Sequence, residues 1–426
     1  MSNDPENIVV SKPGVFYGWF VLAASFVMLF FNAGAQFSIG VMFKPIIADF
    51  GWNRGSISMV AMVNMVLYAF SMLLMGKAYD RFGPKWVILI SATFLGSGFI
   101  GISSMTNLFE FILFYGILCG IGLGGCTVLV FSSLISKWFE KWRGLVISIA
   151  ISGSCLGQFV LIPVYTDLLV SNGWRSTYLL IGGMTFVVNF SLTFLVVKGD
   201  PDQLGYQPLG RTSSESLSPQ PGGQLISETN HDFNLSETSK TVSFWLYIAA
   251  MFVCGAGDFL VVTHLVPFVT DFGITQKSAG NMLAWYGLFS LIGILIVGYA
   301  SDLIGNKIPI ISTFAMRVAL FILILSVQNE VTFYIFSLGF GFTMLITAVL
   351  TVTLIGKMFG FSNIGVLTGL ITTIHHLGGG ILVYAGGIVY DQTGSYENVF
   401  ILSAVMSLIA FVACIFIREK RHLLTE

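Results

Sequence analysis

Charged side chains are scarce in this sequence. Asp, Glu, Lys and Arg together make up 10% of the 426 residues, whereas an ordinary soluble domain carries about a quarter. Hydrophobic residues make up 55%, and phenylalanine alone supplies 39 positions. This composition excludes a soluble globular fold, and the formal net charge of −1 gives no indication of a nucleic-acid partner.

Paired cysteines and metal-binding motifs are also missing. The five cysteines all lie inside apolar runs, and none stands in a C-x-x-C or Cys/His spacing. We therefore expect no disulfide framework, no metal site and no cofactor. No catalytic triad or phosphate-binding loop stands in a suitable context, so we expect that the protein is not an enzyme.

Long polar stretches are absent except at the midpoint of the chain. Residues 198–242 are rich in Pro, Gly, Ser and Thr, which is typical of a disordered linker. This linker, which we expect to be cytoplasmic, separates residues 1–197 from residues 243–426. We expect each of these two parts to form a bundle of six helices.

The rest of the chain consists of apolar runs. A membrane span needs about 20 helical residues, and a helix satisfies all of its own backbone groups in lipid. The sequence thus predicts an all-α integral membrane protein. We place its twelve spans at residues 16–43, 56–78, 86–106, 108–136, 144–170, 175–197, 243–270, 279–300, 308–328, 331–356, 364–390 and 397–417. The first run is too long for a signal-peptide core and is expected to remain as a span.

The distribution of basic residues predicts the orientation. With both termini in the cytoplasm, fifteen Lys and Arg residues fall in inner segments and four in outer loops. Basic residues favour the cytoplasmic side. We therefore expect both termini to be cytoplasmic and the chain to lie in the plasma or inner membrane.

An internal repeat relates the two halves. Gly76-Lys-Ala-Tyr-Asp80-Arg-Phe-Gly83-Pro-Lys85 follows the second predicted span, and Gly298-Tyr-Ala-Ser-Asp302-Leu-Ile-Gly305-Asn-Lys307 follows the eighth, at an offset of 222 residues. A second match, at an offset of 221, pairs Gly144 to Gly157 with Gly365 to Gly378. Duplicated halves are how many secondary transporters build a binding site at the interface between them.

The repeated G-x-x-x-D-x-x-G-x-K pattern, with twelve spans and a central linker, resembles the major facilitator superfamily over essentially the whole chain. The resemblance implies two pseudo-symmetric six-helix bundles. Finer features are similar to the branch of monocarboxylate transporters and oxalate/formate antiporters. They are Tyr17-Gly18-Trp19, the Pro and Gly residues between Pro201 and Gly210, and His264-Leu-Val-Pro267 followed by Asp271-x-Gly273.

The resemblance also assigns the repeated loops to gating. In the family, the motif aspartate contacts the N-terminus of another helix and holds the cytoplasmic side closed, and a carboxylate at a helix N-terminus is favourable. The gating residues expected from the motif are Gly76, Asp80, Arg81, Gly83, Lys85, Gly298, Asp302, Gly305 and Lys307. The alternative is that the two aspartates are ordinary solvated loop charges.

Ionisable residues inside predicted spans are functional candidates, because a charge at mid-bilayer costs on the order of 3 kcal/mol. Asp258 lies near the middle of span seven, where it could carry a proton or make a structural hydrogen bond. His264 lies six residues further on, and His375 and His376 stand in span eleven on different faces. Each could contact substrate or pack. Arg317, in span nine, could be structural or bind substrate.

Polar residues in the first half suggest a complementary lining. Within span one and within span two, the candidates are spaced four residues apart and so share a helix face. The alternative is that such residues hold helices together by hydrogen bonds. The substrate-binding candidates of this half are Asn32, Gln36, Asn64, Tyr68, Tyr115 and Gln158.

These patterns predict a secondary active transporter that moves a small organic solute by alternating access. The branch and the histidines favour a small organic anion, a carboxylate, with protons as the coupling ion. The partners expected are substrate, protons and lipid, and we expect a monomer. Carboxylate-binding members of the branch carry an Asp and an Arg in span eight, where Ser290 and Ile294 stand here, and a span-one Lys, where Phe37 stands. These departures suggest an alternative, an exporter of apolar drugs or metabolites. A different class of protein, a non-transporting membrane sensor on the same fold, is a further alternative.

Overall fold

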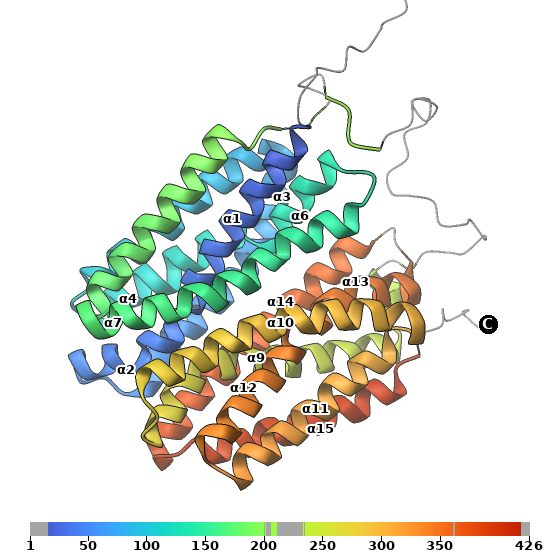
Figure 1. Ribbon diagram of the computed structural model, residues 1–426. Coiled ribbons are helices and arrows are strands. Elements are labelled where there is room, and N and C mark those ends of the chain that lie inside the picture. The colour runs from blue at the N-terminus through green and yellow to red at the C-terminus, as the bar shows by residue number, and fades with distance from the viewer. Residues whose placement is uncertain are drawn as a thin grey trace, which may run out of the picture.

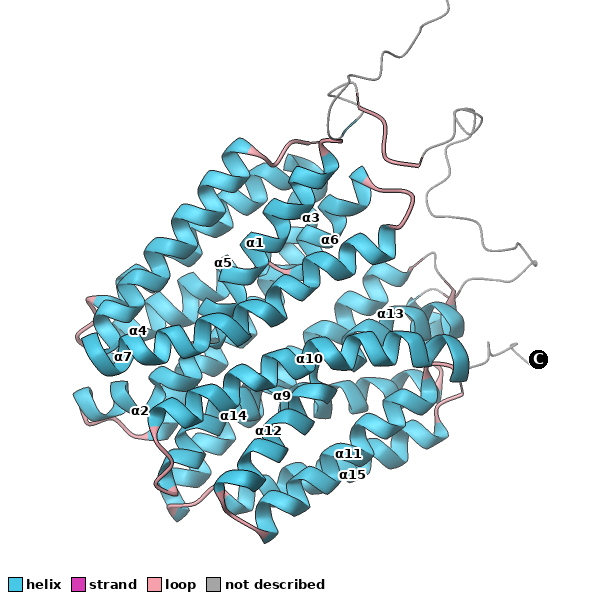
Figure 2. Cartoon of the chain, in the orientation of Figure 1, coloured by secondary structure: helices cyan, strands magenta, loops and turns pink. Residues whose placement is uncertain are grey.

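The protein folds into helices joined by short loops. A computed structural model describes residues 16–199, 201, 206–210, 233, 235–360 and 363–418. Figure 2 shows helices and loops throughout this described part, without a named strand. Both termini and most of the expected linker lie outside the described residues, and so does the prediction that the linker is disordered.

The first half contains the helices up to Leu195. Figure 1 shows them, coloured blue to green, as one group. They are α1 (Gly18–Phe37), α2 (Ile39–Phe50), α3 (Arg54–Ser103), α4 (Leu108–Phe111), the π-helical turn η1 (Ile112–Cys119), α5 (Gly120–Gly125), α6 (Val128–Trp138) and α7 (Arg143–Leu195).

The second half follows the short helix α8 (Leu235–Thr238). Its helices form a second group, coloured yellow-green to red in Figure 1. They are α9 (Val242–Asp271), α10 (Gln276–Ile304), α11 (Lys307–Ser326), α12 (Glu330–Met344), α13 (Ile346–Phe359), α14 (Ile364–Thr393) and α15 (Glu397–Phe416).

The described part of the chain contains twelve helical stretches of membrane-spanning length, as the sequence predicts. Ten helical segments of the described chain are long and apolar enough to cross a bilayer. Two of them, α3 with 50 residues and α7 with 53, are about twice the length that a bilayer requires. Each is interrupted by one glycine with a positive φ, Gly83 at 80° and Gly173 at 78°. Each therefore contributes two spans.

The sequence repeat corresponds to repeated structure. Gly83 has φ 80° and ψ 168°, and its counterpart Gly305 has φ 80° and ψ 174°, a conformation that only glycine adopts readily. The two motif lysines also act alike. Lys85 Nζ donates to the carbonyl oxygen of Phe194 at 3.3 Å, and Lys307 Nζ donates to that of Ile415 at 2.6 Å. Each lysine ties the third helix of its half to the last, at an end where a cation is favourable.

The two halves meet more closely at one end than at the other. We call the end that carries the repeated loops the repeat end, and the opposite end the Arg54 end. At the Arg54 end, ion pairs and hydrogen bonds cross between the halves. At the repeat end, by contrast, four glycines have open space where a side chain would stand. They are Gly76, Gly144, Gly298 and Gly365.

Candidate functional site

A buried ion pair lies in the second half. Arg317 on α11 and Asp258 on α9 are joined by a 2.6 Å contact between Nη2 and Oδ1, and each side chain is 1% exposed. Arg317 also donates to the carbonyl oxygen of Cys254 at 3.1 Å and to the Thr343 hydroxyl at 3.1 Å. Buried charges persist when they are paired and their remaining donors are satisfied, and both conditions hold here.

His375 connects this ion pair to less buried surroundings. Its Nε2 lies 3.2 Å from the second carboxylate oxygen of Asp258. The His375 side chain is 16% exposed, in contrast to the 1% of Asp258. Asp258 thus stands between a permanent cation, Arg317, and a histidine, a residue type that can take up and release a proton. We call Asp258, Arg317 and His375 the charge cluster.

The adjacent histidine faces the other half. The ring of His376 stands edge-on to the ring of Tyr68 on α3, with the centroids 4.7 Å apart. Its Nδ1 lies 2.8 Å from the carbonyl oxygen of Thr372. A carbonyl only accepts, so Nδ1 carries the hydrogen and Nε2 is the acceptor of the neutral ring. The histidine pair of α14 therefore lies at the junction of the two halves, with His375 directed to Asp258 and His376 to Tyr68.

Two residues of the charge cluster, together with the neighbouring Cys254, are potential metal ligands. The thiol of Cys254, a carboxylate oxygen of Asp258 and a nitrogen of His375 lie within 4.8 Å of one another. Such a donor set is one that zinc uses. The guanidinium of Arg317 is 3.4 Å from the Cys254 sulfur and 2.6 Å from Asp258, so a cation already neutralises these groups. We therefore interpret the cluster as an ionic hydrogen-bond network.

Several first-half candidates join helices to one another. Asn32 and Asn189 exchange hydrogen bonds between their side chains, at 3.1 and 2.7 Å, and so join α1 to the end of α7. Asn64 donates to the carbonyl oxygen of Tyr115 at 2.7 Å. Tyr115 itself is buried, with its ring against Phe111. These contacts match the expectation that some polar residues hold helices together.

Two of the remaining first-half candidates, Gln158 and Tyr68, contact the other half. Gln158 donates to the carbonyl oxygen of Leu283 at 3.0 Å, which joins α7 to α10 across the interface. Tyr68 is half-buried beside His376, and Gln36 is half-buried on α1.

His264 lies outside the charge cluster and belongs to a network at the Arg54 end. It is fully buried, and its Nε2 donates to the carbonyl oxygen of Val383 at 3.0 Å. Its Nδ1 then accepts from the Tyr396 hydroxyl at 2.8 Å. That hydroxyl in turn accepts from Arg54 Nη1 at 3.0 Å.

Sequence reasoning did not single out Arg54. This residue begins α3, and its Nη2 lies 2.8 Å from Asp271 at the end of α9. Lys44 contacts the same carboxylate at 2.5 Å. Asp391, near the end of α14, accepts hydrogen bonds from the backbone N–H groups of Arg54 and Gly55, at 2.9 and 2.7 Å. In the sequence, charged residues at the ends of spans cannot be distinguished from ordinary charged loop residues. The network is therefore identified only by the proximity of these residues in the structure.

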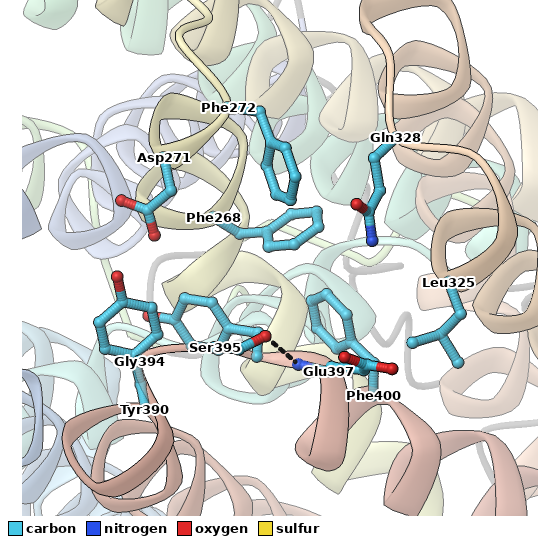
Figure 3. A pocket seen from close by; sticks show the side chains of 11 residues that line it. Phe268, Asp271, Phe272, Leu325, Gln328, Tyr390, Gly394, Ser395, Glu397 and Phe400 are labelled. Atoms are coloured by element: carbon cyan, nitrogen blue, oxygen red, sulfur yellow. Dashed lines mark hydrogen bonds between the residues drawn. The ribbon is translucent and has the colours of Figure 1, made fainter.

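A pocket of about 340 Å³ opens beside that network. Figure 3 shows the carboxylates of Asp271 and Glu397 on opposite sides of it, with aromatic rings between them, among them those of Phe268 and Phe400. All of its lining residues come from the second half. None of the charge cluster lines it, but Asp271, Tyr390 and Tyr396 do, and these three also contact Arg54 of the first half.

The expected gating residues occupy different environments. Asp80, Arg81 and Asp302 are exposed at the repeat end. Gly83 and Gly305 form the breaks in the chain direction, and Lys85 and Lys307 bind helix ends, as described above. Gly76 and Gly298 have open space around them.

Comparisons with known proteins agree with one another. A family model for the Major Facilitator Superfamily matches residues 25–275 and 247–425. The uncharacterized MFS-type transporter YcxA of Bacillus subtilis is 27% identical, and the match covers 95% of this chain and 98% of that protein. Monocarboxylate transporter 13 of Rattus norvegicus is 23% identical, with 92% and 87% covered.

Solved structures show the same fold at low sequence identity. The D-xylose-proton symporter aligns with a TM-score of 0.73 and 13% identity, covering 94% of this chain and 97% of that one. A bacterial homologue of the human lysosomal transporter Spinster, in an inward-facing and occupied conformation, aligns with a TM-score of 0.70 and 15% identity, covering 95% and 97%.

Proposed function

Because the chain belongs to the Major Facilitator Superfamily and is a multi-pass membrane transporter, not an enzyme, we propose that it moves a small organic anion together with a proton. In this proposal, a carboxylate binds at the junction of the two halves, near His375 and His376. Alternating access then exposes that junction to each side of the membrane in turn.

The observation that carries the proposal is the contact of His375 with the buried Asp258. When His375 is neutral, the charges of Asp258 and Arg317 cancel. When it is protonated, the charge cluster carries a net charge of about +1. A buried net charge is unfavourable in a low-dielectric interior, so an anion bound nearby stabilises the protonated state. Proton and carboxylate therefore bind together and leave together.

Proteins similar to this chain support the proposal. Several relatives are monocarboxylate transporters, including those of rat and frog, and one structural neighbour is a proton symporter. Among the substrate candidates of the first half, Tyr68 contacts His376, and Gln36 is half-buried on α1. We assign to Asn32, Asn64 and Tyr115 the supporting role of fixing the helices that carry them.

The orientation is part of the same proposal. The repeat end is assigned to the cytoplasm, with both termini and residues 198–242 on that side, because fifteen Lys and Arg residues then face inward and four outward. The Arg54 end then faces outward, and the structure corresponds to an inward-facing state. Residues 1–197 and 243–426 are proposed as the two moving bundles. Asp80 and Asp302 are proposed to close the repeat end in the opposite state.

Purified protein in liposomes tests the proposal. We expect an inwardly directed proton gradient to drive accumulation of one or more labelled carboxylates from a panel. His375→Gln, which removes the titrating group, should abolish gradient-driven accumulation while exchange of substrate without a gradient continues. The wild-type protein without an imposed gradient serves as the control. If no carboxylate responds to the gradient, or if His375→Gln still accumulates substrate, the proposal is wrong.

One observation favours the second candidate, an exporter of apolar drugs or metabolites. The guanidinium of Arg317 is engaged with Asp258, Thr343 and the Cys254 carbonyl, so it is not available as a direct ligand of an anion. The same liposomes distinguish the two candidates. An apolar exporter should move a lipophilic dye in the direction opposite to the proton flow, and it should transport none of the labelled carboxylates.

A further inference from the structure

The N-terminus of α3 is held by the C-terminal end of α14. Both oxygens of Asp391 are used: Oδ1 accepts from the backbone N–H of Arg54 and Oδ2 from that of Gly55. The first N–H groups of a helix have no partner within the helix, and a carboxylate there is favourable. Asp391, on α14 of the second half, thus acts as the N-terminal cap of α3 in the first half.

The side chain of Arg54 binds the same half at further points. It lies 3.5 Å over the ring of Tyr390, donates to Tyr396 and pairs with Asp271. One residue of the first half is therefore held by α9, by α14 and by the residue that precedes α15. The Arg54 side chain is only 10% exposed, so these contacts are partly shielded from solvent.

The arrangement has a counterpart at the other end of the same two helices. The first segment of α3 and α14 run antiparallel in the same interface: Gly55 lies against Asp391, and Gly369 lies against Leu73. Asp80 stands near the repeat end of α3, as Asp391 stands near the Arg54 end of α14. Asp391 caps the N-terminus of α3, and Asp80 lies on α3 towards the end of the molecule at which α14 begins.

We propose that Asp391 and Arg54 form a latch that holds the Arg54 end closed, and that this latch alternates with the Asp80 contact at the repeat end. Closing one end requires the halves to separate at the other end. Asp391 therefore caps α3 in one state, and Asp80 caps α14 in the other. This inference rests on alternating access but on no particular substrate.

A nearly equivalent contact in the duplicated half supplies a matched control. The side chain of Asn53 caps the N-terminus of α3, and that of Thr275 caps the N-terminus of α10. The two residues are 222 positions apart, which is the offset of the repeated loops. Two residues later, Lys277 pairs with Asp167 across the interface at 2.7 Å. These side chains are 62% and 63% exposed, and the contact involves no backbone N–H. An exposed ion pair of this kind contributes little.

The experiment measures the distance between spin labels at Leu145 and Val366, which are exposed and lie in opposite halves near the repeat end. The five native cysteines are buried, which favours labelling at the introduced sites. In lipid nanodiscs without substrate, we expect Asp391→Ala to raise the ratio of closed to open repeat ends by about two- to fivefold. Asp167→Ala should leave the ratio unchanged.

A second variant keeps the test valid if Asp391→Ala folds poorly. A Cβ on Gly55 would lie 2.7 Å from Asp391 Oδ2, so Gly55→Ala displaces the carboxylate, while alanine itself favours the helix. It should shift the ratio in the same direction. The latch is refuted if both variants match the wild type, or if Asp167→Ala shifts the ratio as much as they do. Because no substrate is present, either result is independent of whether a carboxylate is transported.

Discussion

At the scale of single residues, the defining feature is a charge pair with almost no exposure to solvent. Asp258 and Arg317 stabilise each other only while both are present. Removing one leaves an uncompensated charge in a low-dielectric interior, which typically costs about 3–5 kcal/mol, whereas replacing both with apolar groups of similar volume is often neutral. The pair is therefore better explained by function than by stability.

A stability measurement tests this explanation. Asp258→Asn should lower the free energy of unfolding in detergent by about 3 kcal/mol or more, because Arg317 loses its counter-ion. The double variant Asp258→Asn with Arg317→Met should recover much of that loss. Equal loss in the single and double variants would contradict a charge-based origin.

A second residue-scale prediction concerns Asn32. If it joins helices, Asn32→Ala and Asn189→Ala should be coupled by about 0.6–1.7 kcal/mol in a double-mutant cycle of stability. KM for the transported solute should change little in Asn32→Ala. A large rise in KM without a loss of stability would instead identify Asn32 as a substrate contact.

At the scale of elements, two glycines of the repeated motif mark where one span ends and the next begins. Gly83 and Gly305 occupy the same region of positive φ in the two halves, and a residue with a Cβ pays a conformational penalty there. The motif thus specifies a change of chain direction as well as any gating contact. Gly76 differs, because it is helical and has open space around it.

These two glycines should therefore respond in opposite ways to alanine. Gly83→Ala should destabilise the protein by about 1–3 kcal/mol. Gly76→Ala should be neutral or stabilise by up to about 1 kcal/mol, because alanine is the better helix former. Thermal unfolding of both variants in the same detergent gives the comparison, and similar losses in both would rule out this explanation of the motif.

At the scale of the whole molecule, the two-bundle architecture was predictable from sequence, and the charge cluster was not. Apolar runs, turn glycines and the 222-residue repeat are local or periodic signals, and the fold and family that they predicted are confirmed. Asp258, Arg317 and His375 are 59 and 117 residues apart along the chain. Which faces of α9, α11 and α14 pack together depends on side-chain fit, which periodicity does not encode.

The same reasoning explains the candidates of the first half. Asn32 and Asn64 were recognisable as polar residues within spans, but the sequence could not identify Asn189 and the Tyr115 carbonyl as their partners. His375 and His376 are adjacent, so a helix necessarily turns them to different faces. Which face meets the first half follows only from the packing of α14 against α3.

Labelling from outside intact cells tests the proposed orientation. Glu397→Cys, at the Arg54 end, should react with a membrane-impermeant thiol reagent, whereas Lys77→Cys, near the repeat end, should react only after the membrane is opened. Both positions are exposed, and the native cysteines are buried and serve as a low background. The reverse pattern would invert the orientation proposed here.

The placement of all three ionisable groups in the second half has an electrical consequence. In the proposed cycle, the second half changes conformation in one of two conditions. Either the charge cluster is neutral, or it carries one extra proton whose charge is balanced by one bound carboxylate. Neither crossing moves net charge, although each elementary charge carried across 100 mV would involve about 2.3 kcal/mol. Such a carrier would distribute its solute according to the difference in acidity between two compartments, and the membrane voltage would leave that distribution unchanged.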